Sequence, residues 1–235
     1  MSQEGESRHS GAFGHGEQRR GEQRRGEELR RHILFAAKDV FLETGYERAS
    51  MDTVAVRAGT SKRSLYAHFE SKDKLFLAVL DLIRELYLGA LKTPDAYAED
   101  PVEAVTLFCG RFLQLMVWEP QVRTCRLSIA EAERLPGSSN AYFDHIFVST
   151  YERLSSYLVK QYAMDHARSM VLAEELLDRA VLPRLLRTLL SVEEVIKDTD
   201  KPEDADLAED VDLTSIRRLV LAALRGWLDS GPAGT

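Results

Sequence analysis

One short stretch combines two cations, two hydroxyls, a methyl group and an imidazole on what can be one face of a helix. Its outward residues are Lys62, Arg63, Ser64, Tyr66, Ala67 and His68. A helix capped at Thr60 or Ser61 and running through Phe69 turns Leu65 and Phe69 inward. Lysine and arginine bind phosphates or guanine acceptors, hydroxyls reach phosphates or base edges, and alanine can meet a thymine methyl. The alternative is a solvated helical face, which a few basic residues usually mean.

The residues before this stretch predict a helix-turn-helix. Ser50 can cap a helix that begins at Met51, and Asp52 suits the positive end of that helix. Gly59 can take the left-handed backbone conformation that ends it. Ala55 is small enough to let a second helix cross closely. This combination favours DNA binding over a solvated face.

The stretch AVRAGTSKRSLYAHFESKDKLF, preceded by FLETGYERAS, resembles the amino-terminal domain of the TetR family of transcriptional repressors over roughly Leu29 to Leu80. Thr60 stands where the family often has valine, and Arg63 where it often has glycine. A weaker similarity relates LSIAEAERLPGSSNAYF to the ligand domains of one subgroup of regulators. The resemblance implies a homodimeric repressor that binds a palindromic double-stranded DNA operator and is released by a small-molecule effector.

We assign the DNA contacts to the outward helix face and to three flanking residues. The full set is Ser50, Thr60, Lys62, Arg63, Ser64, Tyr66, Ala67, His68 and Lys72. Local charge fits this assignment although the net charge of the chain is −7. Residues 29–74 hold nine Lys/Arg against six acids, whereas residues 193–212 hold ten acids against two lysines. A basic DNA-binding segment is therefore compatible with an acidic chain.

Composition indicates a globular protein with an all-α fold. The 235 residues are 44% hydrophobic and 8% aromatic, enough for one or two domains with cores. No apolar run approaches the roughly 20 residues that span a bilayer, and the polar start lacks a signal-peptide segment. We therefore expect no membrane partner and a cytoplasmic location.

Three segments are expected along the chain. Residues 1–26 repeat GEQRR, cannot bury a core, and are expected to form a disordered arm. The alternatives are an extra turn of the first helix and a basic arm that follows phosphates or enters the minor groove. Residues 27–74 form an amino-terminal three-helix helix-turn-helix domain. A long helix joins it to a larger helical domain, residues 75–235, for effector binding and dimerisation.

Apolar periodicity and capping residues predict the other helices. The first helix is expected to start near Leu29, and the fourth to run from Ser71 to Thr93. Two helices follow, from Asp100 to Glu119 and from Gln121 to Leu135, and an aromatic helix begins after Pro136. The last two are expected from Ser169 to Leu190, with a kink at Pro183, and from Leu213 to Leu228.

Aromatic and soft apolar residues in the second domain are candidates for an effector pocket. They are Phe108, Phe112, Met116, Tyr142, Phe143 and Tyr151. We expect a mostly apolar pocket with a few hydroxyls, suited to an apolar or aromatic effector that is cationic because this half of the chain is acidic. The alternative is ordinary core packing.

The last two long helices are expected to form a four-helix dimer interface, as in the TetR family. The assigned residues are Leu172, Leu176, Leu186, Leu213, Ile216, Val220, Leu224 and Trp227.

No catalytic or metal-binding pattern stands out. Cys109 and Cys125 lack a CxxC pairing, which fits reduced thiols in a core, with a thiol sensor as the alternative. The six histidines show no ligand spacing, and no nucleophile with a base is recognisable. We therefore expect no cofactor and no enzyme. The competing hypothesis is an all-helical enzyme or adaptor without DNA binding.

Overall fold

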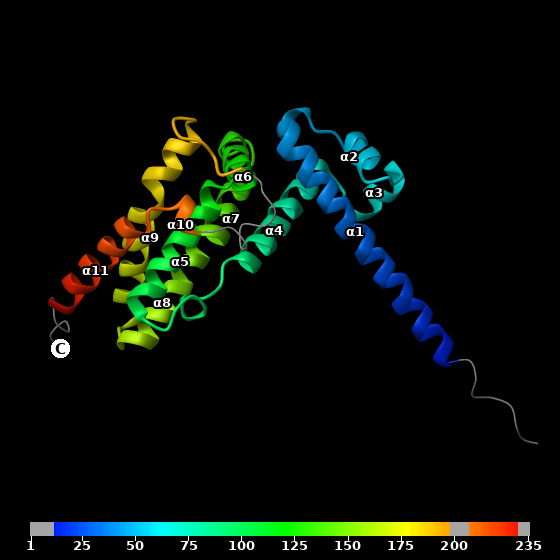
Figure 1. Ribbon diagram of the computed structural model, residues 1–235. Coiled ribbons are helices and arrows are strands. Elements are labelled where there is room, and N and C mark those ends of the chain that lie inside the picture. Colours follow the sequence, from blue (N-terminus) through cyan, green and yellow to red (C-terminus); the bar gives the residue numbers. More distant parts are fainter. Residues whose placement is uncertain (1–11, 198–206, 230–235) are drawn as a thin grey trace, which may run out of the picture. The chain divides into compact units, whose positions relative to one another are not determined.

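The computed structural model describes residues 12–197 and 207–229 (Figure 1). Within these ranges the chain forms helices and no strand, so the all-α fold class is confirmed. The chain divides into two compact units, residues 1–79 and 80–235. The division falls inside helix α4 (Lys72–Ala90), a little later than the boundary after residue 74 that the sequence suggested.

The first unit contains α1 (Ala12–Arg48), α2 (Met51–Arg57), α3 (Lys62–His68) and the first turns of α4. Helix α1 begins at Ala12, so residues 12–26 of the expected disordered arm are helical instead. Glutamate, glutamine and arginine are good helix formers, and they outweigh the cost of the single glycine in each repeat. Residues 1–11 of the arm lie outside the described residues.

Three aromatic rings close the core of the first unit. The rings of Phe41 and Tyr46 stack with centroids 5.9 Å apart, and Phe76 meets each of them edge-on at 5.2 Å. Gly45 has a φ of +77° and interrupts the helical backbone just before Tyr46. The end of α1 can therefore fold back against the start of α4, which fixes the frame for the two short helices.

The second unit surrounds one buried helix, α5 (Figure 1). Its elements in chain order are the end of α4, the 3-10 turn η1 (Pro94–Ala96), α5 (Pro101–Val117), α6 (Glu119–Ala130), α7 (Pro136–Phe143), the π-helical turn η2 (Asp144–Val148), α8 (Ser149–Tyr162), α9 (His166–Leu189), α10 (Leu207–Asp210) and α11 (Leu213–Asp229).

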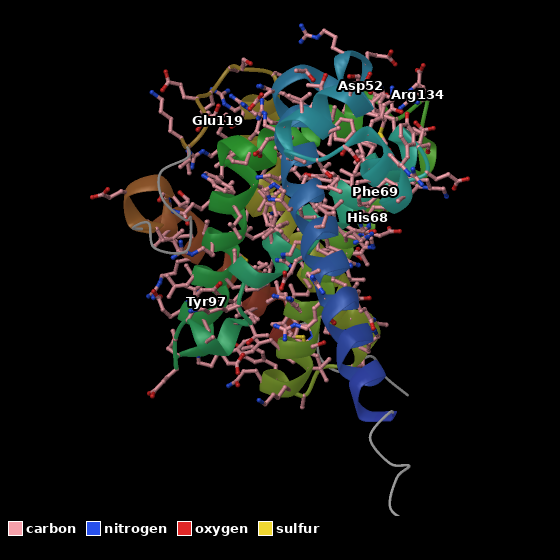
Figure 2. The ribbon with its side chains drawn as sticks, turned by 90° about the vertical axis from the view of Figure 1, so that its right-hand side faces the viewer. Asp52, His68, Phe69, Tyr97, Glu119 and Arg134 are labelled. Atoms are coloured by element: carbon pink, nitrogen blue, oxygen red, sulfur yellow. The ribbon has the colours of Figure 1, made fainter. Side chains whose placement is uncertain are left out.

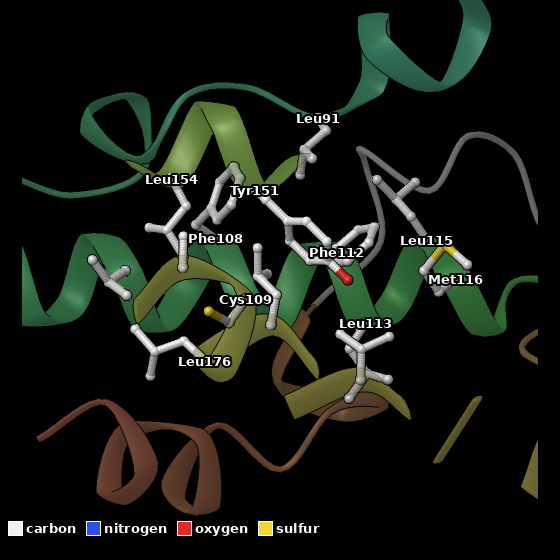
Figure 3. Packing of buried hydrophobic residues seen from close by; sticks show 14 of the residues in the cluster. Leu91, Phe108, Cys109, Phe112, Leu113, Leu115, Met116, Tyr151, Leu154 and Leu176 are labelled. Atoms are coloured by element: carbon white, nitrogen blue, oxygen red, sulfur yellow. The ribbon is translucent and has the colours of Figure 1, made fainter. Parts of the chain in front are cut away.

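Helix α5 contacts both α9 and α11, and α8 packs on α9. The side chains of Phe108, Cys109 and Phe112 are fully buried there (Figure 3). The apolar stripe seen in the sequence therefore lies inside the unit.

Local sequence signals explain most helix boundaries of the second unit. The Asp100 carboxylate accepts a hydrogen bond from the Glu103 amide at 2.8 Å, so the expected cap of α5 is confirmed. Glu103 forms an ion pair with Arg217 rather than reaching back to the cap. Helix α9 continues through Pro183 to its end at Leu189.

Two expected helices have different limits. Helix α6 was expected from Gln121 to Leu135 but runs from Glu119 to Ala130, because Pro120 fits a first helical turn and the chain then forms turns. The aromatic helix after Pro136 is α7 followed by η2 and α8. A π-helical turn of this kind often marks a functional position.

No helix in the described ranges is long and apolar enough to cross a membrane.

Candidate DNA-binding interface

Two serine caps and one glycine set the geometry of the helix-turn-helix. Ser50 Oγ accepts a hydrogen bond from the Thr53 amide at 3.0 Å, and Ser61 Oγ accepts one from the Ser64 amide at 3.1 Å. Of the two possible caps for α3, the structure therefore uses Ser61. Gly59 has a φ of +58°, as its position after α2 requires. The turn between α2 and α3 is therefore defined by sequence-local hydrogen bonds.

The inward side of α3 fixes how it crosses α2. Leu65 is fully buried and Phe69 is 4% exposed. On α2, Val54 and Ala55 are also buried, as expected for a close crossing. Phe69 follows α3 as its C-cap, one residue beyond the helix. Any rotation of α3 about its axis would expose these apolar groups, so the outward face is held in one orientation.

The outward side of α3 presents the polar set expected from the sequence. Lys62, Arg63, Tyr66 and Ala67 are exposed, whereas Ser64 and His68 are half-buried. Figure 2 labels His68 at the end of α3 and Asp52 on α2. Of the flanking candidates, Ser50 is exposed and Thr60 is half-buried. The described first unit therefore gathers a cation, a phenol hydroxyl and a methyl group on one helix face.

Lys62 is not free in this structure. Its ammonium lies 2.8 Å from Asp52 Oδ1, and both side chains are mostly exposed. The hydrogen bond and the charge of Asp52 raise the pKa of Lys62, so the cation is retained. The local sequence places Asp52 at the positive end of α2 and gives no signal of its pairing with Lys62. A phosphate bound by Lys62 must replace this carboxylate.

Lys72 contacts the end of α1, which no local pattern in the sequence indicates. Its ammonium donates hydrogen bonds to the carbonyl oxygens of Tyr46 at 2.8 Å, Glu47 at 3.3 Å and Ala49 at 2.9 Å. It also lies 4.2 Å from the centroid of the Tyr46 ring. These carbonyls end α1, where a cation is favourable. Lys72 therefore joins α1 to α4, and its three N–H donors are engaged within the unit.

A second ion pair joins α1 to α2. The guanidinium of Arg57 donates to both carboxylate oxygens of Glu43, at 3.0 and 2.6 Å. The hydrogen bonds to Glu43 and its charge raise the pKa of Arg57. Because both residues are exposed, no apolar periodicity signalled this pair. It adds a polar brace on the outside of the helix-turn-helix.

Five of the six residues assigned to an effector pocket lie in the core of the second unit. Phe108, Phe112 and Met116 are fully buried, and Figure 3 shows them along α5. The remaining three are Tyr142 and Tyr151, which are buried, and Phe143, which is 49% exposed. Two hollows are described on α9 and α11, and none of the six residues lines either of them.

Two buried tyrosine hydroxyls in this region have polar partners. The Gln121 amide donates to the Tyr142 hydroxyl at 3.0 Å, and the Tyr151 hydroxyl donates to Asp178 Oδ1 at 2.6 Å. Burial raises the pKa of both phenols, and the hydrogen bond to Asp178 raises that of Tyr151 further. A glutamine inside an otherwise buried helix face was the available signal for Gln121. Both phenols therefore stay neutral in the core of the second unit.

The residues assigned to a dimer interface mostly face the core of their own chain. Leu172, Leu176, Ile216, Val220 and Leu224 are buried in the hydrophobic cluster around α5, and Leu213 and Trp227 pack against it. Only Leu186 of that set is largely exposed, at 58%. The assignment of the five buried residues to a partner surface is therefore corrected. An apolar stripe has the same spacing whether it meets α5 or a second chain.

Both cysteines are free and buried. Burial raises the pKa of the Cys109 thiol to about 12 and also raises that of Cys125. A neutral buried thiol is a poor nucleophile, which argues against the sensor alternative. No group of three or more histidine, cysteine or acidic side chains in the described part of the chain could hold a metal ion.

Comparison with known proteins agrees with this geometry. Residues 33–79 match the family described as bacterial regulatory proteins, tetR family. The HTH-type transcriptional activator FasR of Mycolicibacterium smegmatis is 48% identical over 65 residues, which are 28% of this chain and 30% of that protein. The HTH-type transcriptional regulator RutR of Escherichia coli is 37% identical over 94 residues, 39% of this chain and 43% of that protein. The matched region thus spans less than half the length of these relatives.

Solved structures resemble the chain over most of its length. The Flavonoid-responsive Regulator FrrA has a TM-score of 0.64 and 26% sequence identity, covering 87% of this chain and 97% of that one. A putative TetR-family transcriptional regulator from Mesorhizobium loti has a TM-score of 0.63 at 20% identity, covering 88% and 98% of the two chains. At that identity the second likeness shows the fold alone.

The fold and the interface define a helix-turn-helix domain followed by a second helical unit. Residues 33–79 match the helix-turn-helix domain of the tetR family of bacterial regulatory proteins. By their names, FasR is an HTH-type transcriptional activator and RutR an HTH-type transcriptional regulator.

Proposed function

We propose that the protein is a homodimeric repressor that inserts α3 into the major groove at each half of a palindromic operator and is released by a small-molecule effector. The observation that carries this proposal is the two-sided character of α3. Leu65 and Phe69 hold one side, while Arg63, Tyr66 and Ala67 are exposed on the other. A protein that acts on operators works where the chromosome is, so we also place it in the cytoplasm.

The exposed residues of α3 suggest separate roles on DNA. Arg63 can donate two hydrogen bonds to the acceptors of a guanine, which is the commonest specific contact in the major groove. Lys62 can exchange Asp52 for a phosphate, and the Tyr66 hydroxyl can reach a phosphate or a base edge. Arg63 is therefore proposed to specify a base, and Lys62 to contribute affinity.

An exposed apolar row on α9 supports the homodimer. Leu182, Leu186 and Leu190 follow one another at intervals of four residues and are 42%, 58% and 66% exposed. A hollow of about 550 Å³ lies between α9 and α11 and is lined in part by Val171 and by the small residues of α11. An exposed apolar row on one helix can meet its own copy across a two-fold axis, and a two-fold dimer requires a palindromic operator.

The second unit supports an effector that contains an aromatic or apolar body. Phe112 meets the ring of Phe147 edge-on at 5.8 Å, and the hydroxyls of Tyr142 and Tyr151 lie in the same buried cluster. FrrA, at 26% identity, is by its name responsive to flavonoids, which are aromatic molecules. Because α4 contributes residues to both units, a shift of α4 on effector binding can act on the helix-turn-helix.

Selection of bound fragments from random duplex DNA tests the function. We expect one enriched palindrome with half-sites about one helical turn, or a multiple, apart. The triple variant K62A/R63A/Y66A should lose this binding, whereas Lys92→Ala, an exposed lysine of the second unit, should keep it. Unchanged binding by the triple variant would refute the assignment of α3, and a non-palindromic site would refute the dimer.

Effector release has its own test. If an effector weakens operator binding by some factor, the operator must weaken effector binding by the same factor. Titration of the effector with and without operator duplex should therefore give two different affinities. Equal affinities would rule out release by this route and leave the DNA-binding proposal intact.

A further inference from the structure

A buried arginine donor without an acceptor lies on α4 in the second unit. The Nε of Arg84 is enclosed and has no hydrogen-bond partner among the described residues. Buried polar atoms are almost always paired, because an unpaired one loses its hydration without replacement. An unpaired donor on a cation therefore indicates a place where an acceptor can be supplied from outside the chain.

The rest of the Arg84 guanidinium contacts His145 in the π-helical turn η2. Arg84 Nη1 lies 3.4 Å from His145 Nε2, and His145 Nδ1 lies 4.0 Å from Asp81 Oδ1. If Arg84 donates to Nε2, the imidazole carries its proton on Nδ1, toward Asp81. The contact with His145 uses Nη1. It leaves the Nε side of the guanidinium available, and the geometry of that side matches a carboxylate.

Two aromatic residues flank His145 in the sequence. Phe143 stacks on Phe147 with ring centroids 5.1 Å apart, and His145 lies between them in sequence. Phe143 is 49% exposed, and the His145 side chain is 31% exposed, so both can be approached from solvent. The stretch of chain that contacts the Arg84 cation therefore also carries an exposed aromatic ring.

We propose that Arg84, with His145, binds the carboxylate of an aromatic acid whose ring packs on Phe143 and Phe147. This inference rests on the proposed function, because it assigns a chemical class to the effector: an aromatic anion instead of the cationic molecule expected from the acidic charge of the second half. The carboxylate accepts hydrogen bonds from the Nε side of Arg84. Side chains at the site must move to admit it, since Nε is enclosed.

The position of Arg84 on α4 gives this contact a regulatory consequence. Helix α4 begins in the first unit and ends in the second. An acid that bridges Arg84 and the rings beside η2 fixes α4 relative to η2. If operator binding favours a different position of α4, the two binding events are coupled by a free energy. An aromatic acid should therefore change operator affinity, whereas its neutral amide should not.

Binding of 2-naphthoate and of 2-naphthamide to the full chain, measured by calorimetry, tests the site. We expect the acid to bind at least tenfold more tightly than the amide. Arg84→Gln should remove this preference, and Arg84→Lys, which keeps the charge but loses the planar fork, should retain only part of it. Asp81→Asn, which removes a neighbouring negative charge, should tighten acid binding a few-fold. Its matched control is Glu85→Gln, an equal charge change at an exposed α4 residue, which should have no effect.

Three results would overturn the inference: equal binding of acid and amide, absence of acid binding to the wild-type chain, or an Arg84→Gln variant that keeps the preference. Circular dichroism of each variant establishes that the helices are intact. Operator binding by the wild-type chain is measured in parallel. If the chain binds its operator but not the acid, this inference alone fails. If it binds no operator, the proposed function fails.

Discussion

Replacement of Lys72 by methionine distinguishes a structural role from a DNA contact. Methionine keeps an apolar stem near the Tyr46 ring but cannot donate to the three carbonyls at the end of α1. A hydrogen bond to a charged group contributes about 1.5–3 kcal/mol, and a cation at a helix C-terminus about 0.3–1 kcal/mol. The three bonds share one half-buried ammonium and are not additive. We therefore expect the free energy of unfolding of the first unit to fall by about 2–3 kcal/mol.

Urea unfolding followed by circular dichroism measures this change. With an m-value of about 2 kcal/mol/M, the midpoint of the first unit should fall by about 1–1.5 M. Lys74→Met is the matched control, because Lys74 is an exposed lysine two residues further along α4. It should leave the midpoint unchanged.

Operator binding separates the two roles of Lys72. At a temperature where the variant is folded, the slope of log affinity against log salt should equal that of the wild type. A phosphate contact would instead reduce the slope by about 1. An unchanged urea midpoint together with a reduced salt slope would refute the structural role argued from the geometry.

Three further outcomes are expected. Arg63→Ala should weaken operator binding by about 1–3 kcal/mol and relax the preference at one base position, and equal losses at every position would contradict direct base contact. Leu186→Glu should give a folded monomer in sedimentation, because Leu186 is exposed. Leu224→Glu should instead unfold the second unit, because Leu224 is buried in its own chain. A folded, monomeric Leu224→Glu variant would contradict this. The raised pKa of Cys109, about 12, means that the unfolded chain loses this proton first, so the free energy of unfolding should fall as pH rises above about 8.5. Denaturant titrations at pH 8 and 10 should show a smaller fall for Cys109→Ala, and an equal fall would refute this origin.

The helix-turn-helix was predictable because its signals are local. Ser50 and Ser61 cap within three residues of themselves, and Gly59 has a conformation that its own lack of a side chain permits. The inward placement of Leu65 follows from the helical repeat alone. The other residues of α3, which do not fall on the buried side of the helical repeat, form its outward face. These features depend on neighbours along the chain, so they could be derived without coordinates.

In the second unit, the local pattern does not predict which helices pack together. The apolar stripes of α9 and α11 were recognised, but the partner of each stripe was not. Leu176 and Val220 fill the core around α5, while Leu186 remains exposed, although all three have the same chemistry and helical spacing. Periodicity reports that a face is buried, and only the packing of distant helices determines what buries it.

The sequence by itself determined most of the helices, the serine cap of α2 and the polar set on α3, because each depends on residues a few positions apart. The tertiary structure decided that Lys72 holds the end of α1, that Asp52 pairs with Lys62, and that Arg84 meets His145. The contacts of Lys72 and Arg84 join residues more than twenty positions apart, and the pair of Asp52 and Lys62 spans the turn between two helices. Such contacts form only when the elements pack, so no local pattern in the chain can specify them.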